Sequence, residues 1–233
     1  MNLLETQTWL ESILPGETHW TSIKASPDSP PFTVTSLLIN DDGTAEPVDP
    51  ANGNEEQPRG RHAKVTDDLW QILSCTADAA RYSTGLTSPD GMDVRAELLA
   101  VGLARPGEMA QLVAAAATML SEEGSGRLAQ PGTFLPGLGA MVNPAFTTKH
   151  GLLVVPYIWP KGVPTVTEHP DLTTADGQPV NPTHPGRMTL IAQIIMLTEQ
   201  EFLHGMTHGI DSLQTRLAEG GADLRDLRRA SVI

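Results

Sequence analysis

The hydrophobic positions near the start of the chain predict one helix and one strand. Residues 2–14 carry leucine, isoleucine and tryptophan at near-helical spacing, and the Pro-Gly pair at 15–16 ends that pattern. The segment FTVTSLLI at 32–39 is rich in β-branched residues and precedes the turn-forming sequence NDDG. It therefore predicts a strand.

The next apolar pattern, over residues 65–86, predicts a helix but leaves a second interpretation open. Apolar residues recur there at helical spacing from Leu69 to Ala77, and Thr66 or Asp67 is suited to cap the first turn. Two short strands would also fit this stretch.

A strand and a helix follow with clearer patterns. Residues 91–103 predict a strand with alanine, valine and leucine at alternate positions on one face. Residues 106–124 predict a helix with Pro106 near its start, an alanine-rich buried face and Gly124 as its C-cap.

The second half of the chain alternates irregular segments with apolar strands. Residues 131–149 are rich in proline and glycine, which predicts a long turn with an edge strand. Residues 150–160 predict a strand covered on both faces, and 187–198 predict another after a polar loop at 161–187. A helix is expected to begin at Thr198.

Composition divides the chain into two parts. Residues 40–62 contain almost no apolar side chains and three prolines, so we expect a mobile loop or a linker. The first 62 residues are interpreted as an acidic N-terminal arm of helix, strand and loop, either separate from the body at 63–233 or part of the same domain.

The net charge of the chain makes some classes of binding partner unfavourable. The chain has 233 residues, of which 39% are hydrophobic, so it can bury a sizeable core. It has 28 acidic and 15 basic residues and a formal net charge of −13, which repels nucleic acids and anionic membranes. Residues 1–60 hold 10 of the acids and only 2 of the bases. A basic protein is the expected partner.

The expected location is the cytoplasm. A single cysteine, Cys75, excludes an intrachain disulfide and any multi-cysteine zinc site. The first residues carry acids where a signal peptide has lysine or arginine, and no apolar run approaches the roughly 20 residues needed to span a bilayer.

Several short motifs occur in an order and spacing that resemble the suppressor of fused domain family, in its bacterial single-domain type. The resemblance spans residues 64–229. The motifs are YSTGLT at 82–87, VRAELLAVG at 94–102, GEMAQLVAAAATML at 107–120, PGTFLPGLG at 131–139, HGLLVVPY at 150–157 and IIMLTEQEFLHGMTHGIDSLQTRL at 194–217.

This resemblance implies an α+β fold, with a mixed β-sheet flanked by helices, and a protein-binding role without catalysis or cofactor. Bacterial members are proposed to be immunity proteins that neutralise a toxin, which is the function expected here. Animal members bind a transcription factor peptide as an added strand. The alternative is therefore a regulatory adaptor that accepts a peptide strand at an exposed edge near 150–158 or 92–102.

A second alternative, a metal-dependent hydrolase, comes from the segment EQEFLHGMTH at 199–208. His204 and His208 have the i, i+4 spacing that allows two imidazoles to share a metal ion, and Glu201 or His150 is a candidate third ligand. The position after the first histidine is Gly205, where a zincin motif has glutamate.

An ordinary helix start explains the acidic part of the same segment. Thr198 followed three residues later by Glu201 is typical of a capping box, and Gly209 is expected to end the helix. The histidines are then expected on a solvated helix surface.

Candidate partner-binding residues combine two aromatic residues with acids of the N-terminal loop. Trp159 and Tyr157 lie near the end of the buried strand at 150–160, where they would face solvent or a partner. Core packing is the competing interpretation for Trp159. The full candidate set is Trp159, Tyr157, Asp41, Asp42, Glu55 and Glu56.

Overall fold

The computed structural model describes residues 1–40, 43–49, 69–105, 107–122, 127–159, 161–170 and 186–233. Its elements, in chain order, are α1 (Leu3–Ile13), β1 (Trp20–Lys24), β2 (Pro31–Ile39), β3 (Ala45–Pro47), β4 (Trp70–Thr76), the 3₁₀ helix η1 (Ala79–Arg81), β5 (Asp93–Ala104), α2 (Glu108–Ser121), β6 (Phe134–Leu135), α3 (Leu138–Val142), β7 (His150–Val154), β8 (Thr165–Glu168), β9 (Arg187–Leu197), α4 (Glu199–His208) and α5 (Ile210–Glu219).

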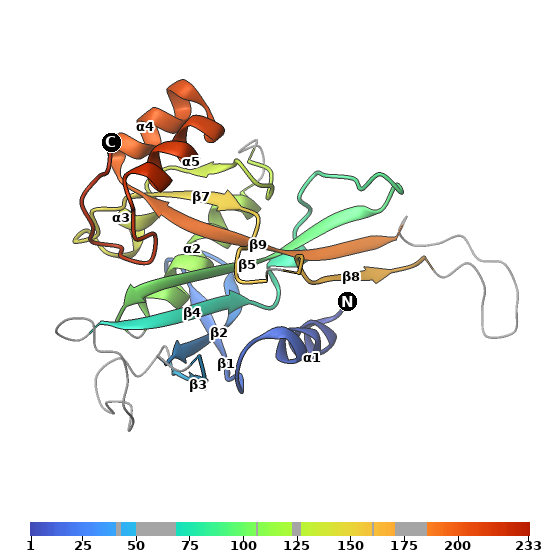
Figure 1. The fold of residues 1–233 in the computed structure, drawn as a ribbon. Helices are drawn as coiled ribbons and strands as arrows, with labels where there is room; N and C mark the ends of the chain where they lie inside the picture. The colour runs from blue at the N-terminus through green and yellow to red at the C-terminus, as the bar shows by residue number, and fades with distance from the viewer. Residues whose placement is uncertain (41–42, 50–68, 106, 123–126, 160, 171–185) are drawn as a thin grey trace, which may run out of the picture.

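The described strands form one mixed sheet. Its order is β1-β2-β4-β5-β9-β7-β6, with β3 beside β2 and β8 beside β9. Strands β5 and β9 run parallel, with Ala96 opposite Leu190, and the other described strand pairs are antiparallel. Helices cover the sheet (Figure 1), so the predicted α+β class with a mixed sheet flanked by helices is confirmed.

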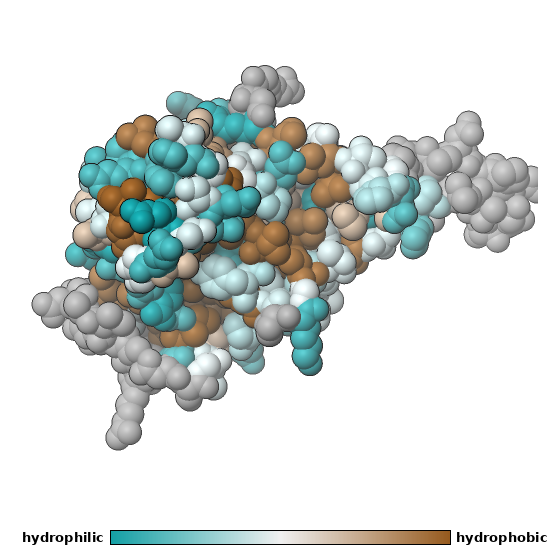
Figure 2. Space-filling model, turned by 45° about the horizontal axis from the view of Figure 1, so that its top comes forward, coloured by the Kyte–Doolittle hydropathy of each residue, from teal (hydrophilic) through white to brown (hydrophobic). Residues whose placement is uncertain are grey.

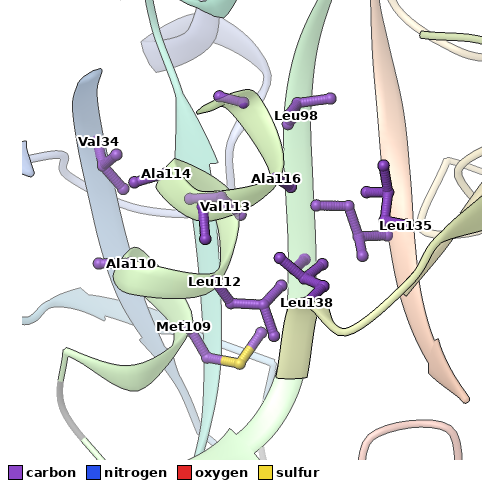
Figure 3. Close-up of a cluster of buried hydrophobic side chains, with 14 of the residues drawn as sticks. Val34, Leu98, Met109, Ala110, Leu112, Val113, Ala114, Ala116, Leu135 and Leu138 are labelled. Atoms are coloured by element: carbon purple, nitrogen blue, oxygen red, sulfur yellow. The ribbon is translucent and has the colours of Figure 1, made fainter. Parts of the chain in front are cut away.

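Helix α2 covers one face of the sheet. Its alanine-rich sequence keeps the helix close to the strands, because small side chains let the two backbones approach. Figure 3 shows Val113, Ala114 and Ala116 of α2 among Val34 and Leu98 of the sheet, all of them buried. The helix was predicted from this pattern, and its described part confirms it. The predicted positions Pro106 and Gly124 lie outside the described residues.

The other face is covered in two parts. Helix α1 packs with Leu10 and Leu14 against Leu37, Leu73 and Leu99 of β2, β4 and β5. Helices α4 and α5 cover the part of this face formed by β7 and β9 (Figure 1). Side chains of the segment that follows β7 pack against this same group of buried leucines under α1.

The helix predicted over 65–86 is wrong for its described part. Residues Trp70–Thr76 form β4, and the three-residue η1 follows. The strand lies between β2 and β5, and its residues from Ile72 to Thr76 are all buried. A strand buried on both faces has no alternation of polar residues, so its apolar run also fits a helix. The proposed caps Thr66 and Asp67 lie outside the described residues.

Residues 131–149 hold more structure than the predicted turn and edge strand. The short strand β6 lies at one end of the sheet order, as expected for an edge strand. The five-residue helix α3 was not predicted. It begins after Gly137, whose φ of 78° lies in the left-handed region that favours glycine.

A glycine inside α4 allows this helix to lie close to its neighbours. A Cβ atom on Gly205 would lie 2.8 Å from Cζ of Phe134 and 2.9 Å from Cδ2 of Leu213. Gly205 is therefore a close-packing position within the helix, although glycine weakens an isolated helix.

A buried ion pair fixes the C-terminal segment against α4. The guanidinium of Arg229 donates to both carboxylate oxygens of Glu201, at 2.7 Å between Nη2 and Oε2, and also to the carbonyl oxygen of Met196. Glu201 is fully buried and Arg229 is 7% exposed. Burial alone would raise the pKa of Glu201, but the hydrogen bonds from Arg229 and from the backbone lower it.

A second buried carboxylate, Glu97 of β5, pairs with no lysine, arginine or histidine in the described part of the chain. It accepts hydrogen bonds from the Thr76 hydroxyl at 2.6 Å and from the backbone N–H groups of Ala79 and Ala80 at 3.0 and 3.2 Å. These bonds hold the first turn of η1 against the sheet. Burial raises the pKa of Glu97 to about 7, although the hydrogen bonds act in the opposite direction.

We predict that Arg229→Met lowers the free energy of unfolding by about 3–5 kcal/mol, because it leaves the Glu201 carboxylate buried without its cation. Arg216→Met is the matched control, since Arg216 pairs with Glu219 while both side chains are more than half exposed. The control should change stability by less than about 1 kcal/mol. Urea unfolding of both variants measures the two changes in stability. Equal losses of stability would contradict the conclusion that the buried Glu201–Arg229 pair matters more than the exposed pair.

The Glu97 carboxyl is predicted to make stability depend on pH. Its folded pKa of about 7 lies above the ordinary value of 4.5, so the folded state binds the proton more tightly than the unfolded chain. This contribution is fully present below about pH 4.5 and is lost as the pH rises through about 7. Relative to Glu97→Gln, the free energy of unfolding of the wild type should fall on the order of 3 kcal/mol between pH 4.5 and 8. Parallel pH profiles in urea unfolding would refute this.

Gly205→Ala should destabilise the protein by about 1–3 kcal/mol, because the added methyl group has no space beside Phe134 and Leu213. Gln200→Ala, at an exposed position of the same helix, is the control and should change stability little. Thermal unfolding distinguishes the two variants. If Gly205→Ala raised the melting temperature, helix propensity rather than close packing would dominate at this position.

Candidate interaction surface

The segment that begins α4 forms the predicted helix start. The Thr198 hydroxyl accepts from the N–H of Glu201, and the Glu201 carboxylate accepts from the N–H of Thr198, so the capping box is confirmed. Gly209 ends α4, as predicted. The Glu201 carboxylate therefore accepts hydrogen bonds from the N–H of Thr198, from Arg229 and from the N–H of Val232, and it is buried under the helix.

His204 and His208 lie on the outside of α4 in an arrangement unlike a metal site. Their rings stack with centroids 4.4 Å apart and planes 22° apart, and Nε2 of His204 lies 2.9 Å from the Ser212 hydroxyl. Partial desolvation and the nearby cationic groups of His208 and Arg216 lower the pKa of His204. The structure does not bring Glu201 together with the two histidines, and the described residues contain no group of three potential metal ligands.

Other side chains of the fold also surround His150 and Cys75. Nε2 of His150 lies 2.8 Å from Oε2 of Glu199, and its ring stacks on Phe202 at 4.2 Å. Cys75 is fully buried in β4, and burial, followed by the charge of Glu97, raises the pKa of its thiol. A thiol in such surroundings is a poor nucleophile.

The two aromatic candidates lie on the segment after β7. Tyr157 is 53% exposed, and its backbone N–H donates to Oε1 of Gln193, a fully buried residue of β9. Trp159 is partly buried and packs against the cluster under α1. The acidic candidates Asp41, Asp42, Glu55 and Glu56 lie outside the described residues.

The strands predicted to accept a peptide at an edge are paired on both sides over only part of their length, at Gly151 and Leu152 of β7 and at Leu99 and Ala100 of β5. Strand β7 lies between β9 and β6, and β5 lies between β4 and β9. The parallel pairing of β5 with β9 could not be anticipated from strand patterns alone, since periodicity does not specify neighbours. Strand β1 occupies one end of the described sheet order.

Three of the four tryptophans gather around the cluster under α1. Trp9, Trp20 and Trp159 are all partly exposed and pack against it from α1, β1 and the segment after β7. The indole Nε1 of Trp20 donates to the Glu11 carboxylate at 3.1 Å. Partly buried tryptophans supply large apolar area at protein interfaces. Because Trp159 is far from the other two in the sequence, only their packing against the same cluster identifies this group.

The outer side of α1 is apolar and acidic. Leu4 and Leu3 are 71% and 44% exposed. Glu5, Glu11 and Glu17 are exposed and have no lysine or arginine partner among the described residues. Residues 1–23 contain no lysine or arginine at all.

Other exposed apolar residues are more dispersed. Val155 is exposed beside Tyr157, and Leu203 and Met206 are exposed on α4. Figure 2, which brings α4 and α5 forward, shows hydrophobic residues in patches between polar ones, without one continuous apolar surface.

The fold defines the chain as an α+β domain built on one mixed sheet. It is similar to the crystal structure of a protein from Neisseria gonorrhoeae provisionally assigned as a homologue of suppressor of fused, with a TM-score of 0.46 and 16% sequence identity. The alignment covers 99% of this chain and 94% of that chain. A similarity of this size does not identify a partner or an activity.

No protein-family model and no curated protein matches the sequence. Among the described helices, none has the length and apolar character needed to cross a bilayer.

Proposed function

We propose that the chain is a non-catalytic protein-binding domain whose partner is a basic protein, and that it acts as an immunity protein that neutralises a toxin. The observation that carries the proposal is the excess of acidic over basic residues in the N-terminal region, together with the exposed leucines and partly exposed tryptophans around α1. Residues 1–60 hold 10 acids and 2 bases within a chain of net charge −13. An acidic surface of this kind accelerates encounter with a basic protein, and apolar anchors then slow its dissociation.

Neutralisation would be steric and electrostatic. The acidic domain would cover the basic surface with which a toxin binds its own target, and no residue of this chain would take part in a reaction. The alternative, an adaptor that accepts a peptide strand, would best use another edge, such as that of β1, since the two segments first considered are paired on both sides over part of their length.

The proposed function predicts a single stoichiometric partner with a basic isoelectric point. Capture with the purified protein from its native cells, followed by calorimetry with the purified partner, tests this. The affinity should fall about tenfold or more between 50 and 300 mM salt, because exposed charges are screened beyond about 10 Å. Co-expression should also protect cells from the partner.

An acidic partner, or an affinity independent of salt, would contradict the electrostatic basis of the proposal. A basic partner that is not toxic when expressed alone would retain the binding role and overturn the immunity role.

A further inference from the structure

The outer side of α1 presents a short stripe of exposed side chains. Leu4, Thr8 and Glu11 are all exposed and are spaced at i, i+4 and i+7, so they lie along one side of the helix. Leu3 is 44% exposed beside them. These leucines are exposed in the free protein. A partner that covers them removes their apolar area from water, which favours the complex.

This stripe continues onto the sheet through a hydrogen bond. The Glu11 carboxylate accepts from the Trp20 indole and from the Thr18 hydroxyl, each at 3.1 Å, through the same oxygen Oε1. These bonds orient the carboxylate and leave its charge without a cation. The face formed by Leu3, Leu4, Thr8, Glu11 and Trp20, hereafter the α1 face, is thus apolar and acidic at once.

The acids around the α1 face differ from three of the four acids on α4 and α5, which lie beside a basic side chain. Glu199 of α4 lies against His150, and Glu219 of α5 pairs with Arg216. Glu5 and Glu11 instead have only backbone N–H, hydroxyl or indole donors among the described residues. Their negative charge therefore remains available to an incoming cation.

We propose that the α1 face is the docking surface, and that it receives an amphipathic segment of the partner with lysine or arginine beside aliphatic side chains. This inference rests on the proposed function and adds where the basic partner binds. The partner's aliphatic side chains would cover Leu3, Leu4 and the edge of the Trp20 ring. Its cations would lie against Glu11 and Glu5, whose charges no lysine or arginine of the described residues balances.

Two synthetic peptides of identical composition in lysine, leucine and alanine test the proposal. One has its leucines on a single helical side, and the other has them distributed around the helix. Fluorescence anisotropy should show the amphipathic peptide binding about tenfold more tightly, and Leu4→Ser should remove that difference. Glu5→Gln with Glu11→Gln should reduce the salt dependence, because glutamine retains the capping and indole acceptors without the charge.

Matched variants on the other helices are the controls. Leu203→Ser removes an exposed leucine of α4 (52% exposed), and Asp211→Asn with Glu219→Gln removes two charges from α5. Neither should change the affinity for the amphipathic peptide. Equal affinity of the two peptides, an equal loss in Leu203→Ser, or binding to anionic vesicles that Leu4→Ser abolishes would overturn the proposal.

The native basic partner separates this inference from the proposed function. If the Leu4 and double glutamine variants bind that partner as tightly as the wild type, the docking surface is wrong and the function stands. If no basic protein binds the wild type, the function itself fails.

Discussion

The fold depends on the position of β9, which pairs with three strands. It runs parallel to β5 along one side and antiparallel to β7 and β8 along the other. A strand in this position is buried on both faces, and from Ile191 to Leu197 every residue of β9 is buried. Both faces of the sheet centre must then be covered by other elements, which accounts for helices on each side.

That constraint also explains how the ends of the chain are held. Strand β9 leads directly into α4 through Thr198, so the Glu201 side chain is buried beneath the first turn of the helix. Arg229 meets it there and also donates to the carbonyl oxygen of Met196 in β9. The C-terminal segment is thereby tied to the central strand. On the second face of the sheet α1 and the α4–α5 pair cover separate areas, and each leaves its own outer surface exposed.

Much of this architecture could be predicted where local patterns are decisive. The helices at 3–13 and 108–121, strand β9 and the capping box at Thr198 follow from spacing and end signals that act within one or two turns. Strand β4 could not be assigned, because the run around Ile72 fits a helix unless its two neighbours are known. Long-range pairs were equally inaccessible: Glu97 with Ala79, Glu201 with Arg229, and Trp20 with Glu11 depend on the completed fold.

The histidines illustrate the limit of spacing as a guide to chemistry. The i, i+4 separation of His204 and His208 is present on α4, but the rings stack on each other and the third candidate ligand lies in a buried ion pair. The features that distinguish the α1 face, charge without a described cationic partner and a partly exposed tryptophan, are visible only in the folded chain, where the partners of Glu5 and Glu11 are known.

The most direct test of this account is hydrogen–deuterium exchange of the protein alone and in complex with its captured basic partner. The account predicts slower exchange in α1 and β1 on binding, with α4 and α5 unchanged. Protection of α4 and α5 without any change in α1 would contradict it.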